Sequence, residues 1–222
     1  MSFSDPAAVA SYADGPPRFV PGFVDMQRMA RVLLAERAPH DARVLVLGAG
    51  GGLELAAFAD GQQGWRFDGV DPSAPMLALA RQATAAHAAR ICLHEGFIDA
   101  APAGPFDAAA CLLTMHFMPA PERSHALRAI HARLRPGSPF VVMHLSAGLD
   151  AAGCARWLAR DAAFGIANGV DPAMAQRRRE VMARDLHVLG PAQDEALLRE
   201  AGFDDIEVFY AGGAFRGWIC HA

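Results

Sequence analysis

The sequence predicts an α/β protein built on one doubly wound, mostly parallel sheet. Short apolar runs alternate with helical segments from residue 43 to residue 145 of the 222-residue chain, a rhythm typical of βαβ units with helices on both faces of a sheet. The first apolar run leads directly into a glycine-rich loop, and open α/β sheets bind ligands at loops of this kind, at the carboxyl ends of their strands. The last two strands follow each other too closely for a crossover, so they predict an antiparallel hairpin.

The predicted elements follow this alternation in chain order. Strands are expected over residues 43–47, 65–70, 91–94, 106–113, 139–145, 206–210 and 214–219. Helices are expected over residues 23–37, 53–59, 73–89, 124–134 and 193–201. Residues 1–22 are predicted to be irregular because turn-forming residues are frequent there. Two successive helical segments within 150–185 interrupt the alternation and predict an insertion.

Composition and charge exclude several classes of protein. Hydrophobic residues make up 53% and charged residues 20% of the chain, which is typical of a globular domain. The formal net charge of −4 disfavours a stable nucleic-acid complex and docking on an anionic membrane. The longest uncharged stretches, 108–121 and 137–149, are shorter than the ~18 residues that a membrane helix needs.

The sequence predicts neither a targeting segment nor a metal site. The N-terminus lacks a basic region and an apolar core, so no signal peptide is expected. The four cysteines are widely spaced, which predicts reduced thiols in a cytoplasmic protein. The nine histidines show no metal-ligand spacing, so no metal is expected. No internal repeat is present, and we expect one domain over 1–222 with an N-terminal cap segment at 1–39 and a helical insertion at 150–190.

The most informative segment is VLVLGAGGGLEL at residues 44–55. A buried strand that runs into glycines and then into a helix lets the backbone approach a ligand closely, and the helix start offers free N–H groups. Asp71 ends the next predicted strand, 21 residues after Gly50, a spacing at which an acid reaches the ribose hydroxyls of a nucleotide-like ligand. Leu53 stands where a pyrophosphate-binding fingerprint requires Gly or Ala. We therefore expect a nucleoside without phosphates, S-adenosylmethionine (SAM).

Five segments, in order, resemble the motifs of class I SAM-dependent methyltransferases. They are VLVLGAGGG, VDPSAPMLALAR (70–81), EGFIDAAPAGPFDAA (95–109), LRAIHARLRPGSPFVV (127–142) and LLREAGFDDIEV (197–208). The resemblance covers roughly residues 40–220. It implies a Rossmann-like sheet of seven strands ending in an antiparallel hairpin, SAM as the cofactor and S-adenosylhomocysteine as the product.

The resemblance also implies a set of cofactor-binding residues. The methionine part of SAM would contact Gly48, Ala49, Gly50 and Gly52. Asp71 would accept hydrogen bonds from the ribose hydroxyls, and the adenine would contact Pro72, Met76, Phe97 and Ile98. Leu112 would lie at the mouth of the site. The sequence departs from the family pattern at Val46 and Phe97, where family members often have Asp; Asp99 is a candidate substitute for the second.

The flanking segments resemble a narrower group, the carboxy-SAM synthases of tRNA wobble-uridine modification. Residues 18–23 (RFVPGF) and the insertion with QRRR at 176–179 carry this resemblance. It implies that Phe23 covers the cofactor, that Arg179 or Arg178 binds the extra carboxylate, and that Arg18 and Arg179 are substrate-binding residues. The glycine loop differs from that of the synthases, and Leu112 replaces an expected polar residue, so we expect a structural cousin and not the synthase activity.

Several individual residues allow two interpretations. His116 follows the fourth strand and is either a general base or a loop histidine bonded to backbone. The arginine run is either a solvated face or holds one inward-turned arginine. Trp157 and Phe164 are interpreted as core residues of the insertion in preference to a substrate cage. The apolar face of helix 23–37 covers either the cofactor or a second copy in a homodimer.

The sequence thus predicts a SAM-dependent methyltransferase acting on a small molecule, without nucleic-acid or membrane partners. A carboxy-SAM synthase or user is one alternative. A non-catalytic SAM-binding module, suggested by Val46 and Phe97, is the other.

Overall fold

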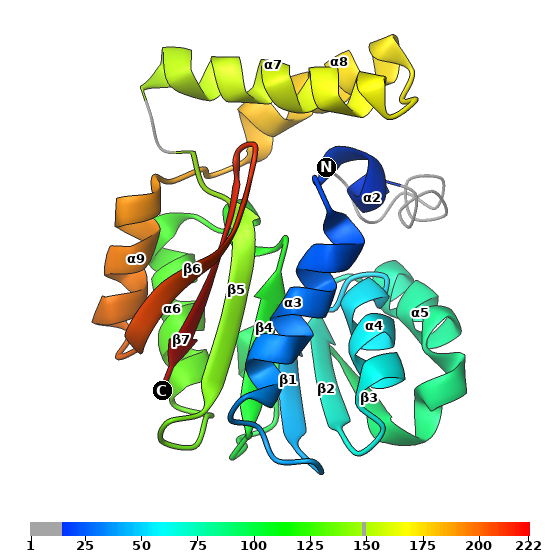
Figure 1. The fold of residues 1–222 in the computed structure, drawn as a ribbon, viewed down its shortest axis with the longest axis vertical. Coiled ribbons are helices and arrows are strands. Elements are labelled where there is room, and N and C mark those ends of the chain that lie inside the picture. The colour runs from blue at the N-terminus through cyan, green and yellow to red at the C-terminus, as the bar shows by residue number, and fades with distance from the viewer. Residues whose placement is uncertain (1–14, 148–149) are drawn as a thin grey trace.

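The computed structural model of the chain describes residues 15–147 and 150–222. Its seven strands form one sheet in the order β3-β2-β1-β4-β5-β7-β6 (Figure 1). In chain order, the strands are β1 (Arg43–Leu47), β2 (Arg66–Asp71), β3 (Ile91–Glu95), β4 (Ala108–Leu112), β5 (Pro139–Leu145), β6 (Asp204–Gly212) and β7 (Phe215–His221).

The first five strands run parallel, and β7 pairs antiparallel with both β5 and β6. The predicted doubly wound sheet with a closing hairpin is therefore confirmed. The parallel strands also bring the loops after β1, β2, β4 and β5 to one edge of the sheet, because the carboxyl ends of parallel strands lie together.

Two apolar cores cover the two faces of the sheet. On one face, Val44 and Val46 pack with side chains of α3 (Phe23–Ala35) and α4 (Leu53–Gly61). On the other, Leu45 and Leu47 pack with α6 (Ala120–His131) and α9 (Pro191–Glu200). Burial on both sides explains why β1 is an unbroken apolar run.

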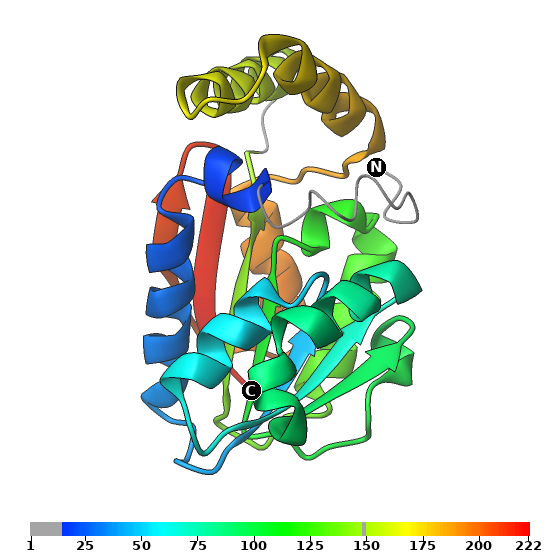
Figure 2. The ribbon, with the colours of Figure 1, turned by 90° about the vertical axis from the view of Figure 1, so that its right-hand side faces the viewer.

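Two helices of the insertion, α7 (Ala151–Ala167) and α8 (Pro172–Asp185), lie across the carboxyl edge of the sheet (Figures 1 and 2). Each has an aspartate N-cap: Asp150 accepts from the Gly153 N–H, and Asp171 from the Met174 N–H. The short helix α2 (Gly15–Phe19) packs beneath α7, where the Asn168 side-chain amide donates to the Arg18 carbonyl over 3.1 Å. We call α2, α7 and α8 the lid.

Several element boundaries differ from the prediction. Residues 15–19, expected to be irregular, form α2, since prolines are tolerated in a first helical turn. The helix expected over 73–89 splits into α5 (Ala74–Ala83) and a 3-10 helix (Ala85–Arg90), because the Thr84 hydroxyl donates to the Ala80 carbonyl and competes with the helical backbone. The helix predicted over 124–134 begins at Ala120, with Pro121 in its first turn. Residues 1–14 of the predicted cap segment lie outside the described residues.

Two further differences concern strand β4 and helix α3. Strand β4 ends at Leu112, one residue earlier than predicted, because Leu113 has a φ of 56°. Helix α3 ends at Ala35, two residues before the predicted end at residue 37, and Met29 on this helix is 40% exposed. No helix in the described part of the chain is both long and apolar enough to cross a membrane.

Candidate cofactor and substrate site

The glycine loop connects β1 to α4 and lies at the carboxyl edge of the sheet. Gly48, Gly50 and Gly52 all have left-handed φ values, of 77°, 48° and 82°. The N–H groups of Gly48 and Ala49 donate to the Val70 carbonyl over 2.8 and 3.0 Å, which fixes the loop to the end of β2. A Cβ at position 48 would lie 2.0 Å from Thr114 Oγ1, so the loop also packs directly against the segment after β4.

Asp71 ends β2 and holds the loop from the other side. Its Oδ2 accepts from the Gly50 N–H and its Oδ1 from the Ser73 N–H, both over 2.9 Å. Partial burial raises the pKa of the Asp71 carboxyl, while these two backbone hydrogen bonds lower it. A carboxylate has about four acceptor positions, so two remain for a ligand. The glycine loop and Asp71, both predicted from the sequence as parts of the site, are therefore in direct contact.

The residues expected around adenine lie at the ends of β2 and β3. Met76 is buried and donates its N–H to the N-cap hydroxyl of Ser73, whereas Pro72 is exposed. Phe97 is 66% exposed, and the neighbouring Ile98 is buried in the core. An exposed aromatic ring beside a buried apolar residue can cover a planar base, although no described contact tests this role.

The two departures from the family pattern have clear structural positions. Val46 of β1 is fully buried in the apolar core, at the position where family members often have Asp. Asp99, the candidate substitute near adenine, pairs with His125 over 3.1 Å on the surface.

Glu54, in the first turn of α4, is a buried acid that the sequence reasoning missed. Burial, with a smaller contribution from the neighbouring charge of Asp71, raises its pKa to about 8, although a backbone hydrogen bond lowers it. Glu54 is therefore close enough to interact electrostatically with Asp71, the residue that bonds the glycine loop. The signal was present in the sequence, since an acid directly after GAGGGL begins the helix that the loop leads into.

The chain makes an unusual turn at the end of β4. Leu112, the last residue of β4, is buried, and Leu113 adopts a left-handed φ of 56° that non-glycine residues rarely take. The Leu113 N–H donates to the Met143 carbonyl over 2.6 Å, which holds this conformation. Strained backbone of this kind often occurs at functional sites, and it places Thr114 against the glycine loop.

His116 follows this turn and is buried. Its Nδ1 accepts from the Leu145 N–H over 3.3 Å, and burial, followed by the charges of His144 and Arg123, holds its pKa well below the usual range. A neutral imidazole that accepts at Nδ1 carries its proton on Nε2. The observed geometry therefore matches the interpretation of a loop histidine bonded to backbone; the general-base role stays a prediction.

The arginine run of α8 has one inward-turned member, Arg178. Its guanidinium bonds Asp161 of α7 and lies 4.0 Å from the ring centroid of Phe19. Arg178 is thus part of the internal packing of the lid. Arg179 is half-buried and its guanidinium has no hydrogen-bond or ion-pair partner in the described chain, which leaves it available for a ligand. Arg18 is exposed on α2, and Phe23 is buried in the core at the start of α3.

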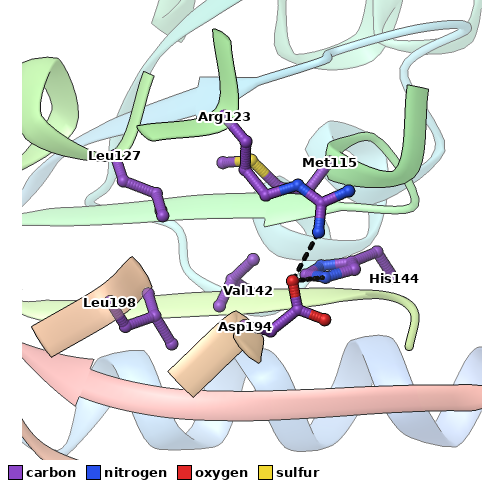
Figure 3. A pocket seen from close by; sticks show the side chains of 7 residues that line it. All are labelled: Met115, Arg123, Leu127, Val142, His144, Asp194 and Leu198. Carbon is purple, nitrogen blue, oxygen red and sulfur yellow. Dashed lines mark hydrogen bonds and ion pairs between the residues drawn. The ribbon is translucent and has the colours of Figure 1, made fainter. Parts of the chain in front are cut away.

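A buried polar cluster beneath the lid was not predicted (Figure 3). Arg123 of α6 bonds Asp194 of α9, and His144 Nε2 of β5 lies 3.2 Å from the same carboxylate. Arg123 also donates to the carbonyl of His187, in the segment that returns from the lid, over 2.7 Å. The His187 N–H in turn donates to the His116 carbonyl. The cluster therefore ties the return from the lid to the loop after β4. No sequence motif marks it, because its members are far apart in the chain.

Cysteines and metal ligands add no chemistry in the described residues. All four cysteines are free thiols, and burial raises the pKa of Cys111, which weakens it as a nucleophile. No group of three or more potential metal ligands occurs in residues 15–147 and 150–222.

Comparison with known proteins defines the class. Residues 44–137 match a family described as a methyltransferase domain. A solved structure described as an O-methyltransferase from Nostoc punctiforme PCC 73102 has a TM-score of 0.70 at 18% identity, covering 98% of this chain and 60% of that chain. The human N-acetylserotonin methyltransferase, solved in complex with SAM, has a TM-score of 0.58 at 16% identity, with coverage of 100% and 60%. Residues 44–137 are therefore a methyltransferase domain within a chain that has the class I methyltransferase fold.

The chain is also similar to a curated protein with a named activity. The carboxy-S-adenosyl-L-methionine synthase of Campylobacter lari is 28% identical over 141 residues, which are 63% of this chain. The match spans 60% of the length of that synthase.

Proposed function

We propose that the protein is a SAM-dependent methyltransferase that acts on a small molecule. The observation that carries the proposal is the contact between the left-handed glycine loop after β1 and the Asp71 carboxylate at the end of β2. The methyltransferase domain at residues 44–137 and the SAM-bound structure of similar fold support the same ligand.

The residues present fit SAM. Asp71 retains acceptor positions for two ribose hydroxyls, and the backbone of residues 48–50 approaches the carboxyl edge without side-chain obstruction at the glycines. SAM supplies an electrophilic methyl group on a sulfonium. The chain would align the acceptor, and the lid would exclude water from the carboxyl edge of the sheet. Proton removal by His116 requires that the Leu145 hydrogen bond be broken, because Nδ1 already accepts from the Leu145 N–H and Nε2 carries the proton of the neutral ring.

A carboxy-SAM synthase or carboxy-SAM user is a second candidate. The name of the Campylobacter relative and the unpartnered, half-buried guanidinium of Arg179 favour it. Arg178 is already paired with Asp161, so Arg179 is the residue of the run that would bind an extra carboxylate.

Calorimetric titration with SAM, S-adenosylhomocysteine and carboxy-SAM tests both candidates. Tighter binding of SAM and S-adenosylhomocysteine is expected for the methyltransferase. Preference for carboxy-SAM, lost selectively in Arg179→Ala, would move the assignment to the second candidate. Absence of binding at millimolar concentrations of all three ligands would reject both.

The remaining assignments are also proposals. Exposed apolar side chains on α3, namely Val24, Met29 and Val32, support a homodimer. Free thiols at all four cysteines support a reducing, cytoplasmic environment. The net charge of −4 supports the absence of a stable nucleic-acid complex.

A further inference from the structure

A cavity of about 220 Å³ lies between the lid and the turn that joins β6 to β7. Its lining includes residues of α2 and α7, the turn at 212–214 and Phe215, the first residue of β7. Phe215 pairs with Leu145 at the carboxyl end of β5, so the cavity lies at the same edge of the sheet as the glycine loop. It is nevertheless separate from that loop, since none of residues 48–52 lines it.

Aromatic rings dominate the wall of this cavity. Phe19, Trp157, Phe164 and Phe215 all line it. Phe164 is 36% exposed although it is a large apolar side chain. Trp157 packs against the apolar core, as predicted, and it also lines the cavity together with the more exposed Phe164. A wall of this composition favours a planar aromatic ligand, because offset and edge-to-face ring contacts add to the burial of apolar area.

The size of the cavity limits the ligand to about one ring. A cavity of about 150 Å³ accommodates benzene. The additional volume admits small substituents on a single ring, and a larger ring system would require the lid to move.

Two polar groups of α7 define which substituents fit. The guanidinium of Arg160 lies 4.6 Å from the ring centroid of Trp157, on the exposed side of the cavity, and has no carboxylate partner in the described chain. Asp161 is 8% exposed, and its Oδ2 bonds Arg178, whereas its Oδ1 is buried without a hydrogen-bond donor. Because Arg178 neutralises Asp161, Arg160 leaves the cavity with a net positive charge. An anion is therefore favoured beside Arg160, and a hydrogen-bond donor is favoured beside Asp161.

We propose that this cavity binds a single-ring aromatic acid that carries a hydroxyl or amino group. Its ring contacts Trp157 and Phe164, its carboxylate pairs with Arg160, and its hydroxyl or amino group donates to the carboxylate of Asp161, which lines the cavity. The proposal goes beyond methyl transfer, and it is tested without SAM, so its failure is distinct from failure of the proposed function.

The test uses the full-length protein and 4-hydroxybenzoate as the probe, with binding measured by calorimetry. Tryptophan emission gives a second signal, because Trp65 and Trp218 are 1% and 0% exposed whereas Trp157 lines the cavity. We expect saturable binding and an emission change that is absent in Trp157→Phe. In the wild type, 4-methoxybenzoate and phenol should each bind about tenfold more weakly, because the first lacks the donor and the second lacks the carboxylate. These analogues test Asp161 and Arg160 without disturbing the ion pair with Arg178.

Variants on α7 provide the matched comparison. Trp157→Ala and Phe164→Ala are expected to weaken binding at least tenfold. Ile166→Ala is the control, since Ile166 is 42% exposed on the same helix and does not line the cavity. Thermal melts identify any variant that fails to fold, and the analogue series in the wild type then decides. The proposal is overturned if 4-hydroxybenzoate does not bind at 10 mM, if the three probes bind equally, or if folded Trp157→Ala and Phe164→Ala bind as well as Ile166→Ala.

Discussion

The Gly50 N–H donates to Asp71 Oδ2 over 2.9 Å, joining the loop after the first strand to the end of the second. The other oxygen of the same carboxylate accepts from the Ser73 N–H. One side chain thus shapes the glycine loop and positions the start of the next helix. Any ligand that bonds to Asp71 meets a carboxylate already oriented by two backbone groups.

Asp71→Asn is expected to weaken SAM binding about tenfold to hundredfold, since hydrogen bonds to a charged group contribute about 1.5–3 kcal/mol. The amide also turns its NH₂ group toward one of the two backbone donors. Calorimetry with SAM measures the loss. Asp41→Asn is the control, because Asp41 is exposed. Unchanged affinity in Asp71→Asn would remove Asp71 from the proposed site.

Gly48 and Gly137 offer a matched pair for testing the packing of the loop. Their φ values are 77° and 76°, but a Cβ meets Thr114 at position 48 and nothing within 4 Å at position 137. Gly137→Ala should therefore cost about 1–2 kcal/mol, from backbone strain alone. Gly48→Ala should cost about 1–3 kcal/mol more, from overpacking, and should also weaken SAM binding. Urea unfolding measures both; equal destabilisation would show that Thr114 moves aside freely.

Glu54 predicts how stability changes between about pH 4.5 and pH 8. Its folded pKa is about 8, whereas the unfolded value is 4.5, so the folded state retains a proton that the unfolded state releases. The free energy of unfolding should therefore fall as pH rises toward 8, by at most about 1.4 kcal/mol per pH unit. Glu54→Gln keeps a neutral side chain and should flatten this fall between pH 6.5 and 8. If the stability of Glu54→Gln in thermal melts falls between pH 6.5 and 8 as steeply as that of the wild type, the raised pKa of Glu54 is contradicted.

The acidic side of the stability profile depends on His116 and His144. Burial lowers the pKa of both imidazoles, so below pH 6.5 the unfolded state takes up protons that the folded state does not. Stability should therefore decrease as pH falls below 6.5. His144→Gln removes one of these groups and should reduce the slope of melting temperature against pH between 5 and 6.5. An unchanged slope would mean that His144 does not govern the acidic limb.

Substitutions of Arg123 and Asp194 should have non-additive effects on the free energy of unfolding. Both side chains are nearly fully buried, so Arg123→Met leaves an uncompensated carboxylate and should cost about 3–5 kcal/mol. The double variant Arg123→Met, Asp194→Leu should be less destabilised than Arg123→Met alone. Arg28→Met is the surface control, since Arg28 and Asp25 form an exposed pair that should contribute under about 1 kcal/mol. Additive losses in denaturant unfolding would show that the buried pair is not coupled.

The positions of the strands along the chain, the closing hairpin and the cofactor loop were predictable because their signals are local. The apolar run at 43–47 and the glycines after it are contiguous, and the spacing to Asp71 follows from one βαβ unit. Helix boundaries were less predictable where a side chain competes with the backbone, as Thr84 does, or where proline begins a helix, as at Pro121.

Tertiary structure decided which polar residues meet. Arg123, His144 and Asp194 come from three separate elements, and nothing in their spacing announces the buried cluster. Likewise, only the packing of α8 against α7 and α2 shows that Arg178 turns inward while Arg179 has no partner among residues 15–147 and 150–222. The sequence by itself therefore determined the fold class and the cofactor edge, through periodicity and contiguous motifs. The packing of α2, α7 and α8 within the lid, the aromatic cavity and the environment of His116 depended on long-range contacts, because burial and hydrogen-bond partners are set by residues distant in the chain.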